Sequence, residues 1–120
     1  MDHDTQLKFL EVKKTLDSIF GSDMDLQSIM FLIGVNELGI GYKDFSKSEK
    51  TDLLHIAICT VLEPFGFYEF EGKDADNWPH FKLIKELPPL NSREQEYLLK
   101  EAIIEYFHTN GYMNNESESF

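Results

Sequence analysis

The densest group of polar side chains that could carry chemistry lies in residues 74–80, a segment rich in turn-forming residues. Carboxylates suit hard cations and imidazole suits transition metals, so this segment is a candidate metal site. An EF-hand loop beginning at Asp74 would need glycine at its sixth position and glutamate at its twelfth, where the chain has Pro79 and Lys85. The alternative is that these polar side chains only build a turn through bonds to backbone groups. The metal hypothesis names Asp74, Asp76 and His80.

A second candidate site follows one stripe of an expected helix. His55 and Cys59 are four residues apart, a spacing that puts two side chains on one helix face, where they can share a metal ion. The same pair could supply a thiol nucleophile and its base. The sequence has no G-x-S-x-G turn and no glycine-rich phosphate loop to complete a catalytic site. The alternative is a cysteine that packs as a small apolar residue, and we expect no catalytic residue, resident metal or cofactor.

Aromatic residues indicate a third kind of site, a surface that binds a partner. The chain has 10 phenylalanines and one tryptophan, and aromatic residues beyond the needs of a small core often lie at interfaces. Trp78 stands beside proline and histidine, and tryptophan is enriched at interface hot spots. The alternative is that Trp78 only covers an edge of the core. The interaction hypothesis places a protein partner, or a second copy of the chain, against Trp78, Tyr68, Phe70 and Phe81.

Two helices are expected before these candidate sites. Apolar residues recur with helical spacing over residues 5–20, and Gly21 then provides a stop. Residues 25–38 are apolar on nearly all sides, which is typical of a more deeply buried helix, and we expect this helix to be central. Gly34 inside it costs about 1 kcal/mol relative to alanine, unless another backbone packs closely there. A crowded helix crossing at Gly34 is therefore expected.

Two further helices are marked by capping signals. A third helix is predicted to start at Ser46 or Ser48, either of which offers an N-cap oxygen, and to end at Pro64; Ser46 and Glu49 have the spacing of a capping box. A fourth helix is predicted from Ser92, again at a capping-box spacing, to about His108.

Between the third and fourth helices the pattern changes to that of strands. Residues 67–71 and 80–87 alternate partly with period two, and residues 72–77 between them are turn formers, which together predict a β-hairpin. The expected fold is thus mainly α with a small β-hairpin, of the α+β class, with the hairpin between the third and fourth of about four helices. Three helices followed by a hairpin is also the element order of a winged helix.

Length and composition bound the class of protein. Leucine, isoleucine, valine and phenylalanine make up about 30% of the 120 residues, enough to fold as a single compact domain, with a disordered tail over residues 112–120. No apolar run approaches the roughly 20 residues that span a membrane, and the N-terminus lacks the features of a signal peptide. One cysteine permits no intramolecular disulfide, so we expect a cytoplasmic protein.

Charge excludes one class of partner. The net charge is −11, with 22 acidic against 11 basic side chains, and neither half of the chain has a basic excess. In a winged helix, residues 49–63 would read DNA, and Lys50 is the only base among them. Nucleic acids require the opposite balance, so we expect neither nucleic acid nor membrane as a partner. The sequence favours a small acidic protein-interaction or regulatory module without catalysis; the alternative is a metal-binding protein or metal-dependent enzyme using residues 74–80 or the His55 and Cys59 stripe.

Overall fold

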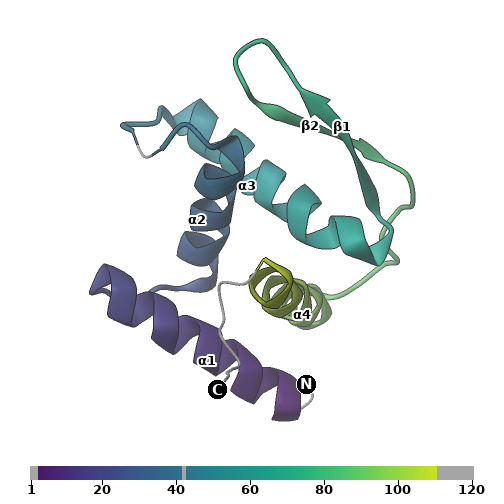
Figure 1. The fold of residues 1–120 in the computed structure, drawn as a ribbon. Coiled ribbons are helices and arrows are strands. Elements are labelled where there is room, and N and C mark those ends of the chain that lie inside the picture. The colour runs from purple at the N-terminus through teal and green to yellow at the C-terminus, as the bar shows by residue number, and fades with distance from the viewer. Residues whose placement is uncertain (1–2, 42, 111–120) are drawn as a thin grey trace. The chain divides into compact units, whose positions relative to one another are not determined.

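The computed structural model describes residues 3–41 and 43–110, which form helices and one hairpin (Figure 1). In chain order the elements are α1 (His3–Phe20), α2 (Leu26–Leu38), α3 (Lys47–Leu62), the short 3-10 helix η1 (Glu63–Phe65), β1 (Tyr68–Lys73), β2 (Pro79–Leu83) and α4 (Ser92–Thr109). The predicted class is confirmed: a mainly helical α+β fold with one antiparallel hairpin between the third and fourth helices. The tail predicted over residues 112–120 lies outside the described residues. None of the described helices is long and apolar enough to cross a membrane.

The chain divides into two compact units. One comprises Met1–Asp23 and Pro89–Phe120 and contains α1 and α4; we call it the terminal unit. The other, Met24–Pro88, contains α2, α3, η1 and the hairpin; we call it the central unit. All three candidate sites from the sequence lie in the central unit.

In the terminal unit, α1 and α4 contact each other through apolar residues. The Lys100 ammonium lies 5.0 Å from the centroid of the Phe9 ring, a cation–π geometry. In the last turn of α1, Ile19 and Phe20 are 67% and 50% exposed. The buried residues are Thr5, Phe9, Val12 and Leu16 on α1, and Ala102, Ile103, Tyr106 and Phe107 on α4.

The start of α4 corrects one prediction. Its N-cap is Asn91, not Ser92: the Asn91 side chain accepts from the N–H of Glu94, and the Glu94 carboxylate accepts from the N–H of Asn91. Asparagine is at least as good an N-cap as serine, and this register places a carboxylate, not a neutral amide, at the positive end of the helix. The capping box of Ser46 and Glu49 at α3 is confirmed.

In the central unit, α2 crosses α3 at very close range. A Cβ atom on Gly34 would stand 2.3 Å from the carbonyl oxygen of Leu53, so no side chain fits there. The expected crowded crossing at Gly34 is confirmed. Beside it, Leu38, Phe45, Leu53 and Ile56 form a buried cluster, against which Phe31, Val35, Trp78 and Phe81 pack.

The hairpin presents two different faces. Its register pairs Tyr68 with Leu83 and Phe70 with Phe81, so these four side chains share one face. Glu69 and Lys82 form a pair on the other face. β1 extends past the predicted residue 71 to Lys73, because the ladder continues through an irregularity between Phe70 and Gly72 toward the turn. β2 ends at Leu83, before the predicted residue 87.

Candidate functional site

The turn of the hairpin is organised by the carboxylate of Asp74. Its Oδ1 accepts hydrogen bonds from the N–H groups of Asp76 (2.9 Å) and Trp78 (3.0 Å), and its Oδ2 lies 2.9 Å from Nε2 of His80. The bond with His80, followed by that from Trp78, holds the pKa of Asp74 below its ordinary value. Both carboxylate oxygens of Asp74 therefore make contacts within the turn.

This geometry bears on the metal hypothesis for residues 74–80. Asp74 and His80 do come together, but they contact each other, and Asp76 takes part through its backbone N–H. Across residues 3–41 and 43–110, no three His, Cys, Asp or Glu side chains are grouped so that they could hold a metal ion. What these contacts build is a turn.

The same turn is fastened to the end of α2. Asn77 adopts a left-handed backbone (φ 73°), and its side-chain amide donates to the carbonyl of Leu38 at 3.1 Å. The ammonium of Lys73 reaches the C-cap of α2, 3.9 Å from the position of a Cβ on Gly39. A cation is favourable at the negative end of a helix dipole. These contacts fix the position of the hairpin tip relative to α2.

Trp78 is half-buried against the apolar cluster beneath the hairpin. Its carbonyl accepts from the N–H of Asp74 at 3.0 Å, which closes the turn. The sequence left two roles open for Trp78, and its packing shows that it does cover an edge of the core.

The second candidate pair, His55 and Cys59, is adjacent on α3 as its spacing predicts. Nε2 of His55 lies 3.6 Å from Sγ of Cys59, and the His55 ring meets Tyr68 edge-on at 6.5 Å. Cys59 is only 1% exposed, and burial raises the pKa of its thiol to about 11. The thiol is therefore protonated near neutral pH and out of reach of a substrate, and it lacks the properties of a nucleophile.

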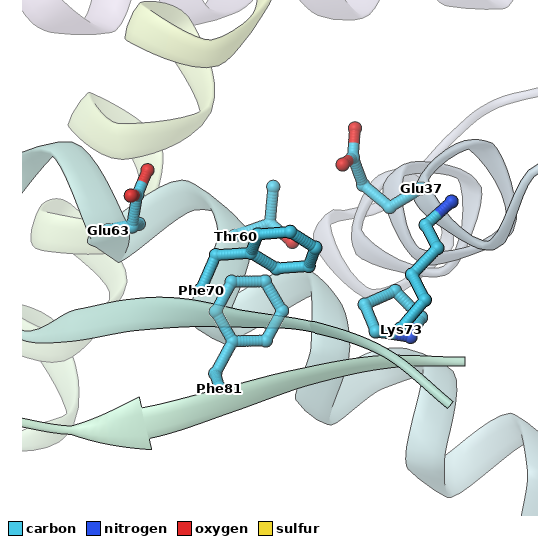
Figure 2. Close-up of a pocket in the computed structure, with 7 residues that line it drawn as sticks. Glu37, Thr60, Glu63, Phe70, Lys73 and Phe81 are labelled. Atoms are coloured by element: carbon cyan, nitrogen blue, oxygen red, sulfur yellow. The ribbon is translucent and has the colours of Figure 1, made fainter. Parts of the chain in front are cut away.

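A cavity of about 250 Å³ lies between the hairpin and the helices of the central unit. At its centre are the rings of Phe70 and Phe81, whose centroids are 5.6 Å apart at 61°. Figure 2 shows Glu63 to the left of this ring pair, with Glu37 and Lys73 to its right. The lining residues are Glu37 from α2, Thr60 from α3, Glu63 from η1, Phe70 and Lys73 from β1, and Pro79 and Phe81 from β2.

The aromatic residues beside this cavity are incompletely covered. Phe70 is 48% exposed and Leu83 is 50% exposed, while Tyr68 and Phe81 are half-buried. The structure thus brings three of the four predicted partner-binding residues onto one hairpin face and places the fourth, Trp78, at the core edge. We call Tyr68, Phe70, Phe81 and Leu83 the hairpin face.

Sequence reasoning missed the charged rim of the cavity. Glu37 and Glu63 are 26 residues apart in the chain, and only the packing of three elements around the hairpin puts both on one cavity. No local motif connects them. Leu83 could have been found, because it alternates in step with Phe81 along the strand.

Comparison of the chain with family models, with curated proteins and with solved structures gives no match.

Proposed function

We propose that this protein is a non-catalytic interaction module that binds a partner protein on the hairpin face. The observation that carries the proposal is the exposure of Phe70, a large aromatic side chain that is 48% exposed in the lining of a cavity. Burying apolar surface contributes about 25 cal/mol per Å², and aromatic side chains are the usual anchors of interfaces. Covering Phe70 and Leu83 is therefore a source of binding free energy that the chain alone does not use.

The charge of the chain favours a basic partner. A net charge of −11 attracts a positively charged surface and repels a second copy of the chain. The residues that line the cavity beside the hairpin face also have a negative net charge, with two glutamates against one lysine. We therefore propose a different protein with basic residues at its contact surface, in preference to a homodimer.

Trp78 has a supporting place in this proposal. Its packing on the cluster of Leu38 and Phe45, together with its bond to Asp74, holds the turn from which β2 returns. Replacing Trp78 would thus disturb both the core edge and the interface, which makes Phe70 the cleaner probe.

The chain offers a matched pair of variants for the test. Phe70→Ser removes an exposed phenylalanine from the hairpin face, and Phe20→Ser removes an equally exposed one (50%) from α1. The test is quantitative affinity capture from cells that produce the protein. We expect at least one partner protein to be captured by the wild type and by Phe20→Ser, but not by Phe70→Ser. Equal retention by all three proteins would contradict a role for the hairpin face.

Light scattering on the purified chain separates the two kinds of partner. We expect the mass of a monomer, because like charges oppose self-association. If the wild type and Phe20→Ser were dimers and Phe70→Ser a monomer, the partner on the hairpin face would be a second copy of the chain and not a different protein.

A further inference from the structure

The cavity beside Phe70 and Phe81 has the size and chemistry to receive one side chain. We propose that it binds the guanidinium side chain of a single arginine of the partner; this inference rests on the proposed function of the hairpin face.

The volume of the cavity restricts the occupant. Pockets for drug-sized ligands span about 300–1,000 Å³, and this cavity, at about 250 Å³, falls below that range. Residues from two strands and from α2, α3 and η1 surround it. An inserted side chain can therefore contact several of these elements at once, which a flat protein surface could not do. One long side chain is an occupant of matching size.

The aromatic part of the lining favours a planar cation. Guanidinium groups stack on aromatic faces, and such contacts contribute about 0.5–2 kcal/mol. Within residues 3–41 and 43–110, the rings of Phe70 and Phe81 contact each other, and no lysine or arginine lies over either of them. Elsewhere the chain does place lysine ammonium groups over phenylalanine rings: Lys100 on Phe9 at 5.0 Å, Lys85 on Phe67 at 5.1 Å and Lys43 on Phe45 at 5.6 Å.

The polar part of the lining completes the match. Glu37 and Glu63 are among the lining residues, and carboxylates accept charge-assisted hydrogen bonds from a guanidinium, which presents five donors in a fixed plane. The hydroxyl of Thr60 donates to the carbonyl of Ile56 at 2.7 Å, so toward the cavity its oxygen is an acceptor.

Lys73 is the one cation in the lining and would oppose this occupant. Its ammonium, however, lies at the carboxyl end of α2, near the C-cap Gly39, where the helix dipole offsets part of its charge. The net formal charge of the lining residues remains negative, because two glutamates face one lysine. A neutral side chain would gain no electrostatic attraction from this arrangement, and an acidic one would be repelled by it.

The inference is tested with three capped tripeptides, acetyl-Leu-Xaa-Leu-amide, in which Xaa is arginine, lysine or citrulline. Citrulline has nearly the shape of arginine without its charge. Binding is followed by NMR through the ring protons of Phe70 and Phe81 at peptide concentrations up to about 10 mM, which detects dissociation constants near 1 mM. We expect the arginine peptide to shift these ring signals and to bind about tenfold more tightly than the citrulline peptide.

Variants of the carboxylates show whether the cavity is responsible. The double variant Glu37→Gln and Glu63→Gln should lower the affinity for the arginine peptide about tenfold. The double variant Glu69→Gln and Glu86→Gln removes the same charge at exposed positions outside the cavity lining and should change the affinity less than about twofold. Equal weakening by this second double variant would reveal a general effect of net charge and would overturn the cavity site.

The outcomes separate this inference from the proposed function. If the arginine and citrulline peptides shift the rings equally, or if no tripeptide shifts them, the arginine site is overturned while partner capture through Phe70 can still succeed. If the arginine peptide binds as expected but Phe70→Ser retains every captured protein, the cavity site stands and the proposed partner surface fails.

Discussion

At the scale of single residues, Gly34 is the position where the structure tolerates least change. A methyl group there would stand 2.3 Å from the Leu53 carbonyl oxygen, which belongs to the backbone of α3 and cannot rotate away. Forcing α2 and α3 apart costs about 1–3 kcal/mol, more than the gain of about 1 kcal/mol from the better helix former. We expect Gly34→Ala to lower the free energy of unfolding by about 2 kcal/mol.

Urea unfolding followed by the fluorescence of Trp78 measures the free energy of unfolding of the unit that contains Gly34. Trp78 is the single tryptophan, and its half-buried ring packs in the central unit that contains Gly34. Gln27→Ala, an exposed change on the same helix, is the control and should stay within about 0.5 kcal/mol of the wild type. A Gly34→Ala variant as stable as Gln27→Ala would mean that the helices separate without cost.

Cys59 gives the fold a dependence on alkaline pH. Its thiol has an ordinary pKa of 9.0, and burial raises this to about 11 in the folded chain. Between these values the unfolded chain releases the thiol proton and the folded chain keeps it, so stability falls as the pH rises. Relative to Cys59→Ala, which has no thiol to ionise, the wild type should lose about 1 kcal/mol between pH 8 and pH 10.

The measurement compares urea midpoints of the two proteins at several pH values. Lysines and tyrosines titrate in the same range, but they are present in both proteins and their effects largely cancel in the difference. A difference in stability that does not change with pH would show that the thiol ionises as readily in the folded chain as in the unfolded one.

At the scale of elements, the hairpin depends on its attachment to α2. Asn77 contributes both a left-handed backbone and a hydrogen bond to the Leu38 carbonyl. Asn77→Ala removes the bond and also puts a poorly suited residue at positive φ, so we expect a loss of about 2 kcal/mol. Asn77→Gly removes the bond but suits this backbone, and a loss of about 1 kcal/mol is expected.

The test is whether Asn77→Ala lowers the free energy of unfolding more than Asn77→Gly does. Because Asn77 adjoins Trp78, their unfolding is best followed by circular dichroism. If glycine proved the more destabilising substitution, the freedom it adds to the unfolded chain would outweigh backbone strain at Asn77.

The elements themselves were largely predictable, because their signals are local. Ser46 with Glu49 marked the start of α3, and the glycine in α2 indicated a close crossing. The helix α4 begins at Ser92 as predicted, but its N-cap is one residue earlier, since Asn91 and Ser92 both satisfy a capping pattern and only the bonds to Glu94 choose between them. Alternation likewise predicted the hairpin, but the irregularity after Phe70 shifted its strand ends.

The cavity could not have been predicted in the same way. Glu37, Thr60 and Glu63 belong to three elements, and each reads as an ordinary polar residue in its own helix. The attachment of Asn77 to Leu38 also joins residues 39 positions apart. Contacts of this kind are set by the packing of elements, and no periodicity or cap in the sequence encodes them.

At the scale of the whole molecule, the excess of acidic side chains opposes folding and favours a basic partner. The chain has 22 acidic and 11 basic residues, so the carboxylates outnumber the cations that could pair with them. Exposed ion pairs such as Lys8 with Asp4 contribute little to stability, about 0–1 kcal/mol. Repulsion is therefore the larger electrostatic effect in the isolated chain.

Salt should consequently act on folding and on binding with opposite signs. Raising NaCl from about 0.05 to 0.5 M shortens the screening length from roughly 14 to 4 Å. Screened repulsion should raise Tm by a few degrees, equivalent to about 1 kcal/mol or less, while the same salt weakens binding of the arginine tripeptide. Thermal unfolding and the NMR titration, performed at matched salt concentrations, measure the two effects.

A variant with less charge shows whether repulsion is the cause. Glu11, Glu71 and Glu86 are exposed, and replacing all three with glutamine reduces the net charge from −11 to −8. This triple variant should be more stable at low salt than the wild type and should gain less from added NaCl, because fewer like charges remain to be screened. A Tm that falls with salt in both proteins would mean that attractive ion pairs outweigh repulsion, and the argument for a basic partner from net charge would then lose its basis.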